Sequence, residues 1–327
     1  MKAAFLDFET LGPTDIDITP LTAQLPNLEL FPTTTQAQLL ARISDIEVVI
    51  LNKVGLNDSV LRSARGLKLV CLAATGTDNV SINSARELEI AVCNIRDYCT
   101  PSVAQHTFSL ILSLTHHLRE YESLLREKAW VHSPQFCLLD FPIRELDGKT
   151  LGIVGLGSLG SRVAEIGRAF GMTILAARQP YSQTVFTDPA PPDLPVERAA
   201  FNELLSRSDV VSLHCPLTPE TENLINATTL QAMRNKAILV NTARGGLIDS
   251  EALVAALREG QIAGAGIDVL RQEPPIEPDP ILESELPNLI VTPHIAWAAQ
   301  ESRQRAVNEI AANIAAYKNG EKRNRIV

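Results

Sequence analysis

Three polar side chains with complementary chemistry follow three separate strand-like segments in the second half of the chain. Arg244, Glu273 and His294 each come shortly after a short apolar run that reads as a buried strand. In an open parallel sheet, the carboxyl ends of the strands line the ligand crevice. The sequence therefore predicts that an arginine, a carboxylate and a histidine converge at one edge of a sheet.

These three residue types suit the reduction of a 2-oxo acid. Such a reaction needs a cation to hold the carboxylate and polarise the carbonyl, and an acid to protonate the oxygen as hydride arrives. Arg244 and His294 fit those tasks, and Glu273 would orient the imidazole and stabilise its protonated form. Taken singly, each residue is as easily a loop ion pair, a solvated acid or a strand-end histidine, so the prediction depends on their convergence.

A glycine-rich turn indicates the source of the hydride. Gly155, Gly157 and Gly160 form a G-x-G-x-x-G pattern directly after an apolar run at 151–154 and before a helix-like segment. The three glycines would permit a tight turn, close approach of a pyrophosphate and tight packing of the helix, whose N-terminus donates N–H groups to phosphate. This context favours a bound dinucleotide over a turn without nucleotide.

The choice between NAD and NADP depends on the end of the next strand. NAD sites usually place an acidic residue there for the ribose, but this sequence reads Ile-Leu-Ala-Ala-Arg178. Arg178 could pair with the 2′-phosphate of NADP, or it could be a solvated arginine at a strand end. The sequence therefore predicts an NAD(P)(H) cofactor, with NADP slightly favoured and NAD left open.

Short apolar runs alternate with helical patterns along the whole chain, which is typical of α/β folds with parallel sheets. The 327 residues exceed what one hydrophobic core usually supports, so two domains are expected. A single long helix is predicted from Val103 to about Leu125, an irregular loop over 181–195, and a closing helix over 298–317. The predicted strands are 3–6, 29–31, 48–51, 69–72 and 90–93, then 151–154, 173–176, 210–213, 237–241, 264–269 and 289–291.

Composition argues against several other classes of protein. The 29 basic and 38 acidic residues give a net charge of -9, which disfavours nucleic-acid binding. The five cysteines are odd in number and show no C-x-x-C spacing, which fits the reducing cytoplasm. Acidic residues near the start and the absence of a long apolar run predict neither secretion nor membrane insertion. His116 and His117 point in different directions on a helix, so no metal site is predicted.

Seven ordered motifs identify a resemblance that covers nearly the whole chain. They are Cys71-Leu-Ala-Ala-Thr-Gly-Thr-Asp-Asn-Val, Tyr98-Cys-Thr-Pro-Ser-Val-Ala-Gln-His, Gly152-Ile-Val-Gly-Leu-Gly-Ser-Leu-Gly, His214-Cys-Pro-Leu-Thr, Asn241-Thr-Ala-Arg-Gly-Gly-Leu-Ile-Asp, Gly266-Ile-Asp-Val and Pro293-His-Ile-Ala-Trp. With them the chain resembles the D-2-hydroxyacid dehydrogenase family, and within it the branch of glycerate dehydrogenases and hydroxypyruvate reductases. Gln105 with His106, and Trp297, are typical of that branch, although both histidine and tryptophan could serve packing alone.

The resemblance implies a set of site residues. Arg244, Glu273 and His294 would be catalytic, which agrees with the roles argued from their chemistry. The substrate-binding residues would be Thr75, Gly76, Tyr98 and Trp297. The cofactor-binding residues would be Gly155, Gly157, Ser158, Leu159, Gly160, Arg178, Cys215, Pro216, Thr242, Ala243 and Asp268. Asp268 would orient the nicotinamide amide, unless it is simply a buried strand-end carboxylate.

The resemblance also implies the domain organisation and the partners. A flavodoxin-like substrate domain would comprise 1–100 and 297–327, and a Rossmann cofactor domain 101–296, with a homodimer formed through the long helix after Pro101. The expected reaction is hydride transfer between NAD(P)H and C2 of hydroxypyruvate or glyoxylate. Two alternatives on the same scaffold stay open: a nucleotide-sensing, corepressor-like binding protein, and a formate or phosphite dehydrogenase.

Overall fold

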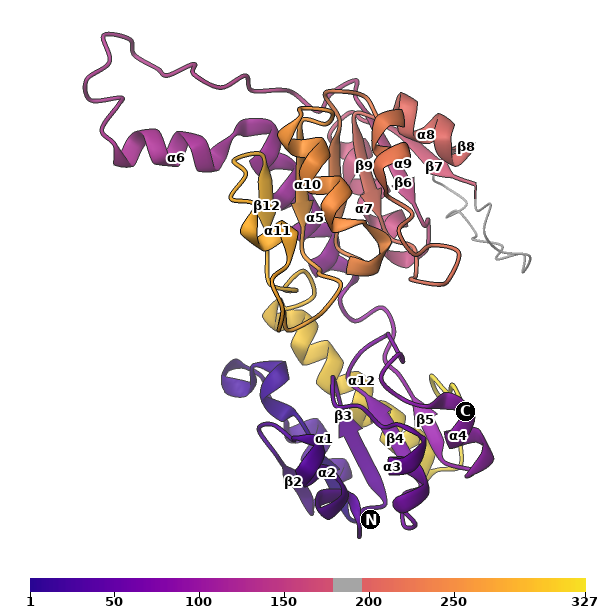
Figure 1. Cartoon of the computed structure of the whole chain (residues 1–327). Helices are drawn as coiled ribbons and strands as arrows, with labels where there is room; N and C mark the ends of the chain where they lie inside the picture. The colour runs from indigo at the N-terminus through magenta and orange to yellow at the C-terminus, as the bar shows by residue number, and fades with distance from the viewer. Residues whose placement is uncertain (179–195) are drawn as a thin grey trace. The chain divides into compact units, whose positions relative to one another are not determined.

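The chain forms two compact units, each built on a parallel sheet. The structure, a computed structural model, describes residues 1–178 and 196–327, and the predicted loop over 181–195 lies outside them. One unit comprises Met1–Cys99 and Trp297–Val327, and the other Thr100–Ala296 (Figure 1). The prediction of two doubly wound α/β sheets is confirmed.

The first unit has five parallel strands in the order β2-β1-β3-β4-β5, the flavodoxin-like arrangement. One face of this sheet packs against α1 and α12 through a core that includes Phe5, Ile50 and Ile310, and the opposite face packs against α2, α3 and α4. The elements are β1 Ala3–Phe5, α1 Thr19–Gln24, β2 Leu28–Leu30, α2 Gln36–Ile43, β3 Val48–Leu51, α3 Asp58–Ser63, β4 Leu69–Leu72, α4 Ile82–Glu87, β5 Ala91–Cys93 and α12 Gln300–Lys318.

In its described residues the second unit has seven parallel strands in the order β12-β11-β10-β9-β6-β7-β8, the Rossmann order extended by one strand. Its strands are β6 Thr150–Val154, β7 Thr173–Ala177, β8 Glu197–Ala199, β9 Val210–Leu213, β10 Ile238–Asn241, β11 Gly264–Ile267 and β12 Leu289–Val291. Its helices are α5 Thr100–His116, α6 Leu118–Arg126, α7 Ser158–Ala169, α8 Phe201–Arg207, α9 Ala227–Ala232, α10 Ser250–Arg258 and α11 Pro280–Glu283. The edge strand β8 was not predicted, because Glu-Arg-Ala has no apolar run.

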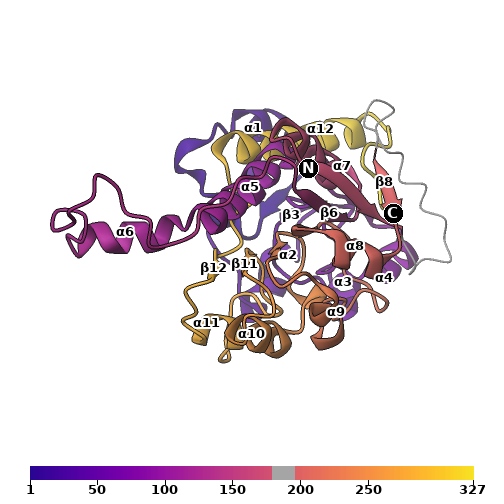
Figure 2. The ribbon, with the colours of Figure 1, turned by 90° about the horizontal axis from the view of Figure 1, so that it is seen from above.

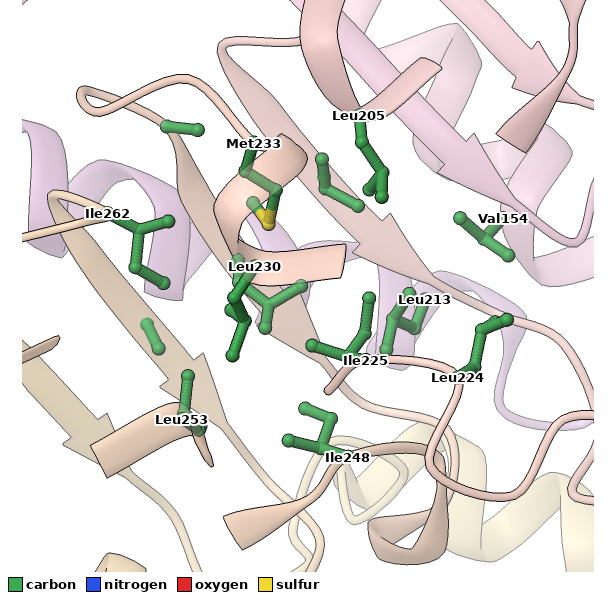
Figure 3. Packing of buried hydrophobic residues seen from close by; sticks show 14 of the residues in the cluster. Val154, Leu205, Leu213, Leu224, Ile225, Leu230, Met233, Ile248, Leu253 and Ile262 are labelled. Atoms are coloured by element: carbon green, nitrogen blue, oxygen red, sulfur yellow. The ribbon is translucent and has the colours of Figure 1, made fainter. Parts of the chain in front are cut away.

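Side chains of this second sheet alternate between two cores. Leu151 and Ile153 pack against α5 and α7, whereas Val154 belongs to the core beneath α8, α9 and α10. Figure 3 shows part of the latter core, where Leu230 and Met233 of the α9 region lie above Leu213 and Ile225. Both faces are apolar because a parallel sheet covered by helices on both sides has no solvent-facing surface.

The prediction of one long helix over 103–125 is wrong, because the chain breaks at His117. That residue has φ of 51°, a left-handed conformation that ends α5 and starts α6 in a new direction. Apolar periodicity continues across the break, so the sequence pattern did not reveal it. Helix α6 and the segment after it, residues 118–143, are called the arm here; they project from the rest of their unit in both views (Figures 1 and 2).

Candidate active site

Arg244 lies in a loop that the end of β10 holds in place. Asn241, the last residue of β10, is fully buried; its side chain donates to the Arg244 carbonyl (2.9 Å) and accepts from the Ala243 N–H (3.0 Å). The guanidinium donates one hydrogen bond to the Ala243 carbonyl at 2.8 Å. The loop backbone is therefore fixed by an asparagine, and the half-buried Arg244 carries a planar guanidinium, the group whose geometry matches a carboxylate.

His294 and Glu273 form a direct pair. The Nδ1 atom of His294 lies 2.5 Å from Oε2 of Glu273, and both side chains are 29% exposed. The other carboxylate oxygen of Glu273 accepts from the Leu270 N–H at 2.8 Å, which fixes the carboxylate relative to the end of β11. With Nδ1 bonded to the carboxylate, Nε2 is the ring atom left for proton transfer.

A glycine lets the loops of Arg244 and Glu273 approach each other. A Cβ atom at Gly245 would lie 1.9 Å from the carbonyl carbon of Leu270 and 2.1 Å from its oxygen. Backbone atoms cannot yield as a flexible side chain would, so only glycine fits there. The Arg244 loop thus packs directly on the residue whose N–H holds Glu273.

Gly245→Ala is expected to lower kcat/KM by about 10- to 100-fold for the 2-oxo acid reduction expected from the sequence, because a shift of about 1 Å in the 270–273 loop would misplace Glu273 and Arg244 together. Steady-state rates at fixed cofactor concentration would measure it. Gly66→Ala is the matched control, since a Cβ there meets only one atom at an ordinary 3.6 Å. Wild-type kcat/KM in Gly245→Ala would refute the coupling of the two loops.

Asp268 is 1% exposed and lies directly after β11. Its Oδ1 accepts from Thr292 Oγ1 (2.5 Å) and the Ile295 N–H (2.9 Å), and its Oδ2 from the Ala296 N–H (2.9 Å). Burial opposes ionisation of this carboxyl, but hydrogen bonds from His106, Thr292 and the two amides outweigh it and keep the pKa of Asp268 below its usual value. Asp268 is therefore an ionised anchor for the loop that carries His294.

The residues of the glycine-rich turn fit a dinucleotide pyrophosphate. A Cβ at Gly155, where φ is 95°, would lie 2.6 Å from the Cys215 nitrogen, and one at Gly160 would lie 2.1 Å from the Gly155 oxygen. Gly157 caps α7 without a side chain, so the N–H groups of Ser158 and Leu159 are not covered by a capping residue. Strands β6 and β9 are neighbours at the point where strand order reverses, the usual dinucleotide crevice.

The loop after β9 forms the other wall of this crevice. His214 donates its backbone N–H to Val154 at 2.7 Å, and its Nε2 lies 2.8 Å from Ser212 Oγ. Its Nδ1 is buried without a hydrogen-bond partner in the part of the chain that the structure describes. Burial lowers the pKa of His214 to about 4, so the ring is neutral near pH 7. Burial also raises the pKa of the adjacent Cys215 thiol to about 11, which makes it a packing residue rather than a nucleophile.

The remaining predicted cofactor residues lie at the carboxyl ends of the same sheet. Thr242 is buried after β10, with its hydroxyl 3.3 Å from that of Thr107, and Ala243 follows it. Pro216 accepts at its carbonyl from Thr221 (2.7 Å). Arg178 follows β7 directly; its backbone N–H donates to Ala199 and its side chain is exposed. The topology of one sheet therefore places all these residues along one edge.

The four predicted substrate-binding residues lie in the other unit. Thr75 follows β4 and donates its hydroxyl to the Ile95 carbonyl at 2.9 Å, and Gly76 comes next. Tyr98 and Trp297 lie where the chain leaves and re-enters this unit, with ring centroids 6.4 Å apart. Trp297 packs against the core beside α12.

Two contacts at the site were missed from the sequence. His106, read as a possible packing residue, lies 2.9 Å from Thr292 Oγ1, and Ser102 donates to the Ala296 carbonyl at 2.6 Å. Their spacing of four residues on one helix face was the available signal. Among residues 1–178 and 196–327, no cluster of three potential metal ligands occurs, and no helix is long and apolar enough to cross a membrane.

Comparison with known proteins agrees with this geometry. Residues 108–296 match the family model of the NAD-binding domain of D-isomer specific 2-hydroxyacid dehydrogenases. The chain is 39% identical over 325 residues to the glycerate dehydrogenase of Methylorubrum extorquens (99% of this chain, 98% of the relative), and 37% identical to the hydroxypyruvate reductase of Blautia hydrogenotrophica (96% and 95%). The crystal structure of D-lactate dehydrogenase from Aquifex aeolicus complexed with NAD and lactic acid superposes with a TM-score of 0.84 at 29% identity, covering 98% and 96%.

The chain therefore belongs to the D-isomer specific 2-hydroxyacid dehydrogenase family. It is a nicotinamide-dependent oxidoreductase that acts on CH–OH groups. The family, fold and enzyme class predicted from the sequence are confirmed.

Proposed function

We propose that the protein reduces hydroxypyruvate or glyoxylate to the D-2-hydroxy acid, and catalyses the reverse oxidation. The main support is the 2.5 Å hydrogen bond between His294 Nδ1 and Glu273 Oε2. This pair lies at the same edge of the sheet as Arg244 and the glycine-rich turn. Glycerate dehydrogenase and hydroxypyruvate reductase are the names of two relatives that match nearly the whole chain. Together these support a small 2-oxo acid as substrate.

The side chains would divide the work as follows. Arg244 binds the substrate carboxylate and the carbonyl oxygen, which stabilises negative charge on that oxygen. The nicotinamide, when bound, supplies the hydride that reduces C2. His294 donates the Nε2 proton to the oxygen, and Glu273 holds the imidazolium through Nδ1. In the oxidation direction His294 accepts that proton instead.

The family resemblance also supports Thr75, Gly76, Tyr98 and Trp297, all in the first unit, as substrate-binding residues. Backbone N–H groups near Thr75 and Gly76 would bind the carboxylate, and Tyr98 and Trp297 would limit the size of the side chain at C3. The tilted contact between the two rings supports this, because each ring restrains the other.

NADP is the cofactor that we favour slightly over NAD. Arg178 presents an exposed guanidinium directly after β7, and the described residues at that strand end include no carboxylate that would repel a 2′-phosphate. Asp268, which directly follows β11, would orient the nicotinamide amide.

Initial rates with NADH and NADPH, each with hydroxypyruvate, glyoxylate, pyruvate and 2-oxoglutarate, test the proposal. Turnover with the first two supports it, and preference for either of the last two would replace the substrate assignment. Arg178→Ala should raise KM for NADPH about tenfold and leave KM for NADH nearly unchanged if Arg178 binds the 2′-phosphate. Tight NADH binding without turnover on any substrate would favour a sensing role.

We also infer that two copies pair through the arm. The arm concentrates large apolar side chains that are exposed to solvent, and such a concentration usually marks a protein–protein contact. They are Leu118, Leu125, Trp130, Val131, Phe136, Leu139 and Ile143, between 50% and 89% exposed. The arm returns on itself, with Tyr121 Oη bonded to the Phe141 backbone, so it is a shaped element. Light scattering should find a dimer in the wild type and in Ile276→Ser, and a monomer in the Trp130→Ser/Phe136→Ser double variant.

All five cysteines are free, including Cys71 and Cys93, which are register partners on β4 and β5. Burial raises the pKa of both thiols, which keeps them unreactive. Unpaired neighbouring thiols support a reducing compartment such as the cytoplasm.

A further inference from the structure

The backbone at His294 is held in an unusual conformation. Its φ is 55°, in the left-handed region that residues other than glycine adopt uncommonly. Such a conformation persists only where the surroundings impose it. The 292–296 loop must therefore be restrained by specific contacts.

Most of these restraints come from β11. Thr292 and His294 donate their N–H groups to the carbonyls of Ile267 (2.9 Å) and Asp268 (2.8 Å). The Asp268 carboxylate then binds the next two amides, Ile295 and Ala296. The 292–296 loop is thus wrapped around one buried carboxylate. The orientation of the His294 side chain therefore depends on the position of Asp268.

Helix α5 restrains the same loop from a second side. Ser102 and His106, one turn apart, bind the Ala296 carbonyl and Thr292 Oγ1 respectively. Thr292 Oγ1 lies 2.5 Å from Asp268 Oδ1, and a hydroxyl has one proton, which an ionised carboxylate can only accept. Thr292 Oγ1 therefore accepts a hydrogen bond from His106, so the His106 Nε2 carries a hydrogen. His106 donates to Thr292, and Thr292 donates to Asp268.

We propose that His106 is a positioning residue for His294, acting through Thr292 and Asp268. The inference rests on the proposed role of His294 as proton donor. The His106 Nε2 also lies 3.4 Å from Asp268 Oδ1, and the ring is 18% exposed, so it is enclosed beside the carboxylate that anchors the loop. Packing alone would require neither the hydrogen nor its alignment with Thr292.

His106→Leu should lower kcat about tenfold while KM for the 2-oxo acid and Kd for the cofactor stay within about twofold, since Arg244 and the glycine-rich turn are untouched. His106→Gln can still donate from its side-chain amide and should restore most of kcat. His116→Leu, the same exchange at an exposed position of α5, should match the wild type. Thr292→Val removes the hydroxyl that links His106 to Asp268 but keeps the shape of the side chain, so this variant should resemble His106→Leu.

Amide hydrogen exchange separates this proposal from the proposed function. Ile295 and Ala296 should exchange about tenfold faster in His106→Leu and Thr292→Val than in the wild type, whether or not any substrate is turned over. If neither variant changes exchange at these amides, the positioning role is overturned even if the enzyme is active. If the wild type fails to reduce any 2-oxo acid but exchange accelerates, the proposed function fails and the anchoring role stands.

Discussion

Arg244→Ala is expected to reduce kcat/KM for hydroxypyruvate by about 1000-fold or more, equivalent to about 4 kcal/mol of transition-state stabilisation. The guanidinium is the cation proposed to bind both the carboxylate and the carbonyl oxygen, and negative charge grows on that oxygen as hydride arrives. The guanidinium donates to the carbonyl of the neighbouring Ala243, and the buried Asn241 side chain, which the substitution leaves in place, holds the loop backbone. The fold should therefore survive the substitution.

Steady-state rates over the substrate panel would measure the effect, and NADH fluorescence titration would show that cofactor affinity is retained. Arg244→Lys should recover only part of the rate, because an ammonium keeps the charge but not the planar fork. Arg258→Ala on the exposed side of α10 is the matched control. Wild-type kcat/KM for Arg244→Ala on every substrate would remove Arg244 from the mechanism.

His294→Asn is expected to lower kcat for reduction by about 100- to 10,000-fold, the usual contribution of a general acid. Asparagine is the appropriate replacement because it tolerates the left-handed backbone found at this position. The variant should bind NADH normally, since the glycine-rich turn is not altered. A fall in kcat of less than about threefold would contradict the proton-donor role.

The sequence alone determined the architecture and the residues worth testing. Buried parallel strands appear as short apolar runs, so every strand that the structure describes, except β8, was predicted within one or two residues. The G-x-G-x-x-G turn follows its strand directly, because the chemistry of a pyrophosphate site is local in sequence. Arg244, Glu273 and His294 were selected because each follows a strand whose end faces the same edge.

Only the tertiary structure decided how these residues are held. The break at His117 depends on one backbone dihedral angle, which apolar periodicity does not report. The approach of Gly245 to Leu270, and of His106 to Thr292 and Asp268, joins residues 25 to 186 positions apart along the chain. Such contacts are set by strand order and helix packing rather than by local preference. The sequence thus determined which groups can do the chemistry, and tertiary packing determined where those groups lie and how they are oriented.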